Sequence, residues 1–272
     1  MLLLLPPSEG KSAPASGDPV DLDELALPEL TAPRRRVLSA LLAVSGRRDA
    51  TERLGVGATL ATEVARNLHL LEAPAAAARE VYTGVLFSAS GLAGLEGAPR
   101  DRAARTVLVV SGLWGVVGPE DRIPAYRLSM GTTLPRTGAL APFWRPHLGA
   151  ALDATSAEHV VVDCRSATYA AAWTPPTSGA GHVTVRVERE TDGRRTVVSH
   201  WAKQARGALV GHLLTRAGAE PATPGDVLTA ALELVGAGPL GHTAPGLMTS
   251  ELRTAELTAG PRGTHVLTLV TG

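Results

Sequence analysis

Three short apolar runs, each followed at once by small polar residues, constrain the fold of this chain of 272 residues more than any other feature. The runs cover residues 2–5, 106–110 and 159–164, and their apolar side chains stand at consecutive positions. Consecutive apolar residues are typical of strands that are buried on both faces. The sequence therefore predicts an internal sheet, with polar loops at 7–11, 111–112 and 165–166 following three of its strands.

The remaining pattern mixes helices with strands. Apolar residues recur at helical spacing over 28–44 and again from Leu60 to Leu71. Residues 182–189 alternate, with Val183, Val185 and Val187 inward, and Asp192-Gly193 predicts a hairpin into 196–199. Further helices are expected at 202–215 and 225–235, and a last strand at 266–270. We expect a mixed α/β (α+β) fold, a single compact domain over 1–272 with a central sheet, and a helical subregion over 28–80.

Composition excludes several classes of protein. The 26 basic and 26 acidic side chains cancel, so that any attraction to an anion must be local. The single cysteine, Cys164, excludes a disulfide scaffold and is expected to be a small core residue. No apolar run approaches the ~20 residues of a membrane span, and the opening residues lack the basic region of a signal peptide. We expect a cytoplasmic protein with no membrane partner.

Lysine is rare in this chain. Lys11 and Lys203 are its only two lysines among 26 basic residues. An ammonium group becomes a nucleophile when its pKa is depressed, whereas a guanidinium group stays protonated. On composition alone, a chance survival of the two lysines and a specific role for them both stay open.

The loops that follow the three buried strands are candidates for one anion site. Ligands bind beyond the carboxyl ends of parallel strands, where hydroxyl, amide and cationic groups would suit a phosphate. We expect the loops Ser8 to Lys11, Ser111-Gly112 and Arg165-Ser166 to converge on one pocket, with the helical pair Lys203 and Arg206 beside it. The alternative is that these are ordinary turns.

Two further segments suggest contacts to nucleic acid. Leu54-Gly55-Val56-Gly57, between two predicted helices, has the form of a helix-hairpin-helix turn, in which Gly55 and Gly57 would direct backbone N–H groups at a phosphate. Tyr126 and Arg127 together suit a base and its phosphate. A structural turn and a solvated loop are the alternatives. The eight histidines show no metal-ligand spacing, and we expect neither a metal site nor a cofactor.

Taken in order, the motifs over residues 1–215 resemble the YaaA family of bacterial peroxide-stress proteins. The matching segments are Leu-Leu-Pro-Pro-Ser-Glu-x-Lys at 4–11, Val-Tyr-Thr-Gly at 81–84, Val-Ser-Gly-Leu-Trp-Gly-Val-Val-x-Pro-x-Asp at 110–121, Pro-x-Tyr-Arg-Leu-x-Met-Gly at 124–131, Phe143-Trp144, Ser166-x-x-Tyr169 and Ala-Lys-x-Ala-Arg-Gly at 202–207. Both lysines fall inside these motifs. Gln204 stands where many relatives have a second lysine, and Ser166-Ala167-Thr168-Tyr169 lacks a glutamate found in some of them.

The resemblance implies a compact mixed α/β fold with a basic cleft and a helix-hairpin-helix-like element. It also implies DNA binding without sequence preference and a role in limiting iron-driven damage during peroxide stress. We therefore expect double-stranded DNA or another phosphate-bearing ligand as partner. The residues expected to contact it are Ser8, Tyr82, Ser111, Gly112, Trp114, Tyr126, Arg127, Ser166, Tyr169 and Arg206.

An enzyme is the alternative interpretation of the same residues. A desolvated lysine, Lys11 or Lys203, would attack a carbonyl or a sugar carbon of a nucleotide or of damaged DNA, as in a glycosylase/lyase. Glu9 or Asp121 would then serve as the acid–base partner.

Overall fold

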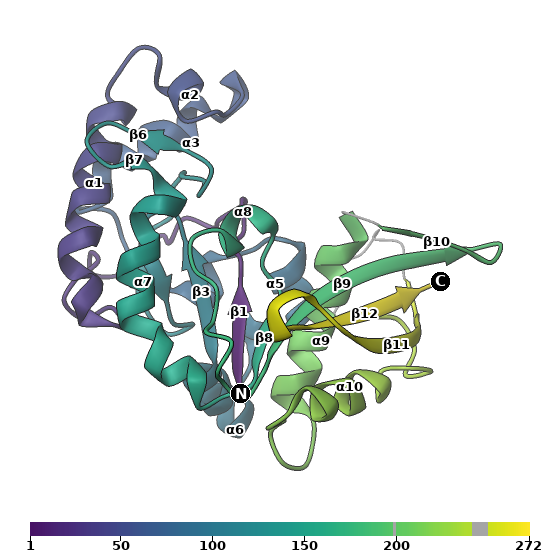
Figure 1. Ribbon diagram of the computed structural model, residues 1–272. Coiled ribbons are helices and arrows are strands. Elements are labelled where there is room, and N and C mark those ends of the chain that lie inside the picture. The colour runs from purple at the N-terminus through teal and green to yellow at the C-terminus, as the bar shows by residue number, and fades with distance from the viewer. Residues whose placement is uncertain (198–199, 241–249) are drawn as a thin grey trace.

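One mixed sheet forms the centre of the protein. The computed structural model describes residues 1–197, 200–240 and 250–272 (Figure 1). In spatial order the sheet contains β11 (Leu252–Ala259), β12 (His265–Thr271), β9 (His182–Thr191), β8 (Val161–Asp163), β1 (Leu2–Leu5), β3 (Val107–Ser111) and β4 (Gly115–Val117), and β10 (Arg194–Val197) pairs with β9. The predicted mixed α/β class is confirmed.

The three apolar runs are neighbours in the middle of this sheet. Strand β1 lies between β3 and β8 and is parallel to both, with Leu3 opposite Val107 on one side and Val162 on the other. All four leucines of β1 are buried, as expected for a strand covered on both faces. Because parallel strands end at the same edge of a sheet, the loops that follow β1, β3 and β8 leave from one edge.

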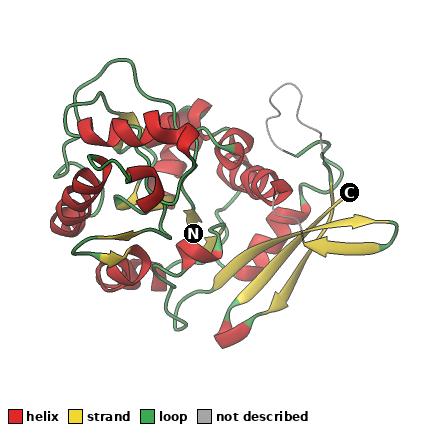
Figure 2. Ribbon diagram, turned by 90° about the horizontal axis from the view of Figure 1, so that it is seen from above, coloured by secondary structure: helices red, strands yellow, loops and turns green. Residues whose placement is uncertain are grey.

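The other half of the sheet is longer and ends in antiparallel pairs. Strand β9 is parallel to β8 and β12, whereas β10 and β11 run antiparallel to their neighbours. Val183, Val185 and Val187 are buried, as predicted from their alternation. The hairpin at Asp192-Gly193 also forms, although residues 198–199 of its expected second strand lie outside the described residues. Figure 2 shows these long strands at one side of the molecule and most helices at the other.

Helices lie on both sides of the strands. Figure 1 shows α1 and α7 beside β3 and β1, and α9 with α10 beside β9, β12 and β11. The α-helices are α1 (Thr31–Ser45), α2 (Ala50–Arg53), α3 (Ala61–Arg66), α4 (Ala78–Val81), α5 (Val85–Ser90), α6 (Gly97–Thr106), α7 (Leu140–Ala157), α8 (Ala167–Ala170), α9 (His200–Thr215) and α10 (Pro224–Leu232). Short 3-10 helices are η1 (Pro28–Leu30), η2 (Ala58–Leu60), η3 (Asn67–His69), η4 (Leu92–Gly94) and η5 (Pro261–Gly263).

The subregion over 28–80 departs from the prediction in two ways. Ala76 and Ala77 form a short strand, β2 (Ala76–Ala77), which pairs with β5 (Arg122–Ile123), so the subregion is not all helical. The predicted face from Leu60 to Leu71 is divided between α3 and η3, and Leu68 and Leu71 are exposed. The turn Leu54 to Gly57 does lie between helices, and its assignment as a helix-hairpin-helix element stays a prediction.

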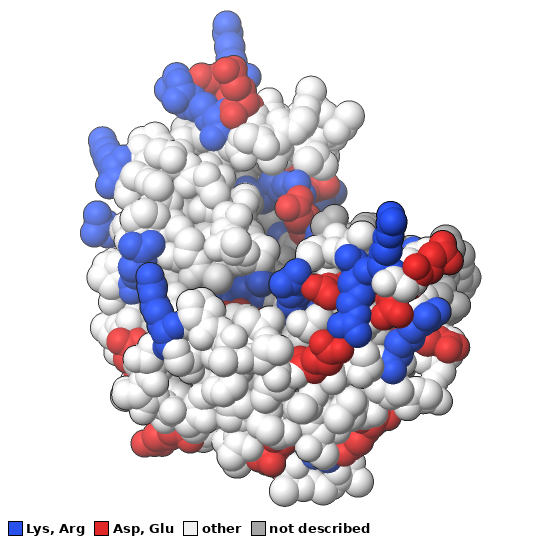
Figure 3. All heavy atoms as spheres, turned by 45° about the vertical axis from the view of Figure 1, so that its right-hand side comes forward, with Lys and Arg blue, Asp and Glu red and all other residues white. Residues whose placement is uncertain are grey.

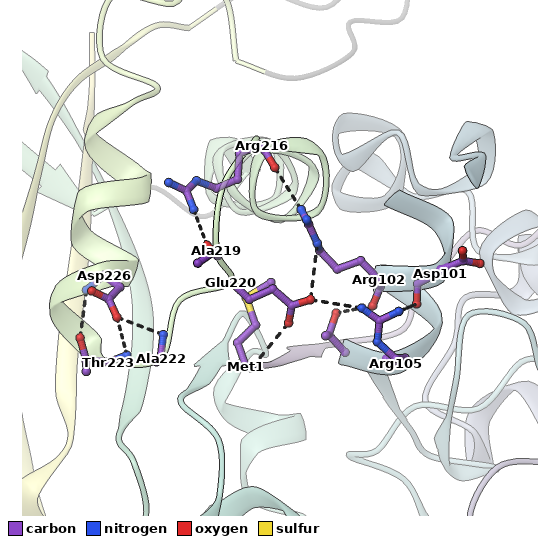
Figure 4. Close-up of polar contacts among 11 residues, drawn as sticks. Met1, Asp101, Arg102, Arg105, Arg216, Ala219, Glu220, Ala222, Thr223 and Asp226 are labelled. Carbon is purple, nitrogen blue, oxygen red and sulfur yellow. Dashed lines mark hydrogen bonds and ion pairs between the residues drawn. The ribbon is translucent and has the colours of Figure 1, made fainter. Parts of the chain in front are cut away.

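Two anchors position the elements around β1. The buried amino group of Met1 lies 4.0 Å from Glu220 Oε2, and Glu220 also pairs with Arg102 and Arg105 of α6 (Figure 4). Helix α9 packs on α5 at Gly207, where a side-chain Cβ would collide with the Leu86 carbonyl oxygen. The strand that leads into the polar loop is thus held at its start, and α9 lies against α5, the helix that follows residues 82–84.

Candidate functional site

The loop after β1 is fastened to the Tyr82–Gly84 segment. The Ser8 hydroxyl donates to the Gly10 carbonyl and accepts the Thr83 N–H at 3.1 Å. Gly84 packs so closely that a Cβ there would lie 2.7 Å from Ser8 Cβ. The motifs at 4–11 and 81–84, which are far apart in the sequence, therefore pack directly against each other and form one wall of the site.

Lys11 projects from this wall onto two tyrosine rings. Its Nζ donates to the Ser8 carbonyl at 2.7 Å and lies 4.3 Å from the centre of the Tyr126 ring and 5.6 Å from that of Tyr82. Burial, together with the nearby charge of Arg127, lowers the pKa of Lys11 from 10.5 to about 7. A substantial fraction of Lys11 is therefore a neutral amine at neutral pH, while partial exposure leaves it accessible.

Behind Lys11 runs a chain of hydroxyl groups. The Tyr82 and Tyr126 hydroxyls are 3.0 Å apart, and the Tyr126 hydroxyl is 2.7 Å from Ser111 Oγ at the end of β3. Ser111 Oγ also accepts the N–H groups of Leu113 and Trp114. Burial raises the pKa of both tyrosines, so that both phenols are neutral and able to donate. The predicted partners from 8–11, 82, 111 and 126 are brought together.

Arg127 supplies the permanent positive charge next to Lys11. Its Nη2 pairs with Glu9 Oε2 at 3.0 Å and its Nη1 with Glu63 Oε2 at 3.3 Å. Its backbone is held on both sides by the buried Asn67, which accepts the Arg127 N–H at 2.8 Å and donates to the Arg127 carbonyl at 2.9 Å. The Arg127 side chain is 14% exposed and that of Glu9 73%, so this ion pair has a solvated partner that can move away.

A pocket of about 130 Å³ opens among these groups. Lys11, Arg127, Tyr169 and the turn residues Gly55 and Val56 all contribute to its wall. Burial raises the pKa of Tyr169, which keeps its phenol neutral. The structure thus joins the loop after β1, Arg127 and the turn residues 54–56 in one site. Gly57, the last residue of the turn, does not line the pocket.

The helical pair on α9 does not line this pocket. Lys203 is exposed, and Arg206 donates to the Val185 carbonyl at 3.0 and 2.7 Å. Arg206 lines a different cavity of about 390 Å³, together with the buried pair Asp163 and Arg165. The single expected pocket is therefore two, because α9 packs against β9 rather than above β1.

Three other candidates, Gly112, Trp114 and Asp121, have structural contacts, and a fourth, Ser166, is exposed. The Gly112 carbonyl accepts Trp144 Nε1 at 2.9 Å, and Trp114 is fully buried edge-on to Tyr126. Asp121 accepts the N–H groups of Ala26 and Gly118, and burial raises its pKa. Ser166 is exposed at the start of α8.

The sequence interpretation missed two buried polar residues that shape the site. Arg34 is fully buried and donates to the carbonyls of Trp114 and Val116, and burial lowers its pKa to about 10. Arg34 lies three residues before Val37 and seven before Leu41, which places it on the apolar face of α1, so the spacing in the sequence could have predicted its burial. Asn67 likewise lies three residues after the buried Val64, a spacing that places both side chains on one helix face.

Charges of both signs face the site. Figure 3 shows a hollow in the surface in which Lys or Arg atoms and Asp or Glu atoms are both visible. Around the pocket, Lys11 and Arg127 are accompanied by Glu9 and Glu63. The expected basic cleft stays a prediction.

Neither metal ligands nor a membrane helix is found in the described ranges. Within residues 1–197, 200–240 and 250–272, no group of three or more His, Cys, Asp or Glu side chains is placed to hold a metal ion. In the same ranges no helix has the length and apolar content needed to cross a membrane. Cys164 is buried, and burial raises the pKa of its thiol to about 12, in line with a core role.

Comparison with known proteins places these motifs in a family. A family model described as peroxide stress protein YaaA matches residues 1–226, which include every residue of the pocket. The chain belongs to the YaaA peroxide stress protein family. The matched region ends within α10, before β11 and β12.

Curated relatives of this chain carry the name UPF0246 protein. A UPF0246 protein of Streptomyces coelicolor is 46% identical over 237 residues, which cover 86% of this chain and 90% of the relative. A UPF0246 protein of Corynebacterium efficiens is 39% identical, covering 84% of this chain and 90% of the relative. One from Corynebacterium glutamicum is 36% identical, with coverage of 77% and 83%.

Proposed function

We propose that this protein acts in peroxide stress by binding double-stranded DNA through its phosphates, without sequence preference, and so shields DNA from iron-driven oxidation. The observation that carries the proposal is the shared pocket of Lys11, Arg127 and the turn residues Gly55 and Val56. An ammonium and a guanidinium group are donors that proteins use on phosphates, whereas the Gly55 and Val56 N–H groups donate to the Glu52 and Thr51 carbonyls and shape the wall beside them. The family's description as a peroxide stress protein supports the physiological setting.

Binding would begin with the displacement of Glu9. An exposed ion pair contributes only ~0–1 kcal/mol, so a phosphate can replace the Glu9 carboxylate on Arg127 at little cost. The buried Asn67 keeps the Arg127 backbone in place during this exchange. The incoming anion also favours the charged form of Lys11, whose amine then takes up a proton.

Titration of labelled duplexes tests this proposal. With about four phosphate contacts, affinity should fall roughly a hundredfold between about 50 and 200 mM salt, and equally for unrelated sequences. Arg127→Gln should weaken binding about tenfold, since hydrogen bonds to charged groups contribute ~1.5–3 kcal/mol. Arg100→Gln is the matched control, because Arg100 also pairs with a glutamate, Glu120, but lies outside the pocket. A flat salt response, or equal losses in both variants, would contradict the proposal.

A second candidate function is favoured by the lowered pKa of Lys11. The neutral amine adds to the aldehyde carbon of an opened abasic sugar; a C–N bond forms, and the carbonyl oxygen leaves as water with the two amine protons, which yields an imine. The Tyr126 ring lies 4.3 Å from Lys11 Nζ and covers one side of the amine. Borohydride reduces such an imine to a stable adduct. We expect an adduct with abasic duplex in the wild type and in Lys203→Arg, and none in Lys11→Arg; its absence from the wild type rules this candidate out.

A further inference from the structure

A second, larger cavity shares no lining residue with the Lys11 pocket. It has a volume of about 580 Å³ and lies between α1, α2 and the turn of the hairpin formed by β6 (Thr133–Leu134) and β7 (Gly138–Ala139). Five arginines line it, and we call it the arginine groove: Arg35, Arg36, Arg47, Arg53 and Arg136. No function considered above uses these side chains.

The positive charge of the arginine groove is only partly compensated. Arg47 and Arg53 share Asp49, at 3.0 and 2.7 Å. Arg35 pairs with Asp23 at 3.2 Å through side chains that are both more than half exposed. Among the described residues, Arg36 and Arg136 make no ion pair, and no Asp or Glu side chain lines the cavity. Two solvated carboxylates thus face five guanidinium groups, and such exposed pairs are weak enough for a bound anion to replace them.

The floor of the groove is apolar and made of small side chains. Ala40, Ala43 and Val44 of α1 lie opposite Pro135 of the hairpin turn. Ala43 is exposed, which leaves room for a flat ring system to reach the helix. Cationic groups at the rim and an apolar floor match a ligand with an anionic end and an apolar body.

The backbone of Arg136 has a conformation that glycine adopts more readily. Its φ is 65°, in the left-handed region where an arginine costs more free energy than a glycine. The hairpin thus keeps a guanidinium group at the mouth of the groove although glycine would fit the backbone better.

We propose that the arginine groove binds a nucleotide with two or more phosphates, the phosphates on the guanidinium groups and the base on the floor of Ala40, Ala43 and Pro135. Guanidinium groups bind phosphates through paired N–H donors. The volume falls in the range of roughly 300–1,000 Å³ that is usual for small-ligand pockets. A DNA duplex presents phosphates on a convex surface with its bases inside, so it would leave the apolar floor without a contact. This site extends beyond the DNA-binding function and does not depend on it.

Calorimetric titration of the full chain with ATP, inorganic tripolyphosphate and adenosine tests the site. ATP should bind at least about tenfold more tightly than either fragment, since each fragment lacks one of the two halves of the contact. Failure of ATP to bind at millimolar concentration, or equal affinity for tripolyphosphate, overturns the proposal.

Two matched variants locate the binding. Arg136→Gly removes one guanidinium group and suits the left-handed backbone, so it should fold at least as well as the wild type and bind ATP about tenfold less tightly. Arg262→Gly is the control, because Arg262 also has a positive φ, 56°, and lies in η5, away from the groove. Ala43→Glu, which places a carboxylate on the floor, should abolish binding. Equal effects of the two glycine variants, or variants that weaken only duplex DNA binding, overturn the assignment.

Discussion

The lowered pKa of Lys11 makes the stability of the protein depend on pH in a predictable direction. Burial and the charge of Arg127 hold the pKa at about 7 in the folded state, against 10.5 ordinarily. Between these values the unfolded chain binds the proton and the folded chain does not, so the free energy of unfolding rises with pH, by at most about 1.4 kcal/mol per pH unit. The cost is fully present below pH 7 and is relieved as the pH rises. From pH 7 to 9 the expected gain is about 2 kcal/mol.

The variant Lys11→Met isolates this effect. Methionine has a similar length and no charge, so the contribution of position 11 no longer changes with pH. Burial also lowers the pKa of the Met1 amino group, which adds a slope of the same sign in both proteins. The difference between wild type and variant therefore reports Lys11 alone, whatever the variant loses through its missing hydrogen bond to the Ser8 carbonyl.

Urea unfolding at pH 7, 8 and 9, followed by tryptophan fluorescence, measures these free energies. The wild type should gain about 2 kcal/mol more than Lys11→Met over this range. Equal slopes for the two proteins would show that Lys11 has an ordinary pKa. In that case both its neutral form at pH 7 and the imine chemistry that depends on it would be refuted.

Three further substitutions test the packing and the charges around the site. Gly207→Ala should lower the free energy of unfolding in urea by about 1–3 kcal/mol, because its methyl group meets the α5 backbone. Gly225→Ala in α10 is the control: its methyl group has only ordinary contacts, so the free energy of unfolding should stay the same or rise by up to about 1 kcal/mol. Asn67→Ala should cost about 2 kcal/mol or more, since two backbone groups of Arg127 lose their partner, and should weaken duplex binding in a salt titration. Lys203→Arg keeps an exposed charge outside the Lys11 pocket and should leave duplex affinity within several-fold of the wild type in that assay; a complete loss would place Lys203 itself in the duplex contact.

The strand edge around β1 was predictable because its signal is local. Continuous apolar runs mark strands buried on both faces, and the polar residues directly after them, Ser8 to Lys11 and Ser111, lie where parallel strands end. The contact between Lys11 and Tyr126 was not predictable in detail. It depends on how the Pro124–Met130 segment folds back over β1, and no periodicity in the sequence encodes that path.

The location of α9 shows the limit of such reasoning. Spacing predicts that Lys203 and Arg206 share a helix face, and they do lie on one helix, three residues apart. Spacing does not say which strand the helix covers. Gly207 and Gly211 decide this, because their missing side chains allow α9 to pack closely on α5, and the helix then lies against β9. Arg206 of α9 accordingly lines a cavity other than the one beside Lys11, and Lys203 is exposed.

The two candidate functions make opposite demands on Lys11, and pH separates them. A phosphate clamp needs the ammonium form, which gains population as the pH falls below about 7, whereas imine formation needs the neutral amine, which gains population above it. A phosphate bound at Arg127 raises the pKa of Lys11, so an occupied clamp suppresses the nucleophile in the same pocket. If DNA shielding is the function, duplex affinity should therefore fall from pH 6 to 8 in the wild type and stay constant in Lys11→Met. If the pocket is catalytic, the yield of borohydride-trapped adduct should instead rise over the same interval, and added inorganic phosphate should inhibit it most at the lower pH. A duplex affinity that is independent of pH, combined with a rising adduct yield, would favour the enzyme over the clamp.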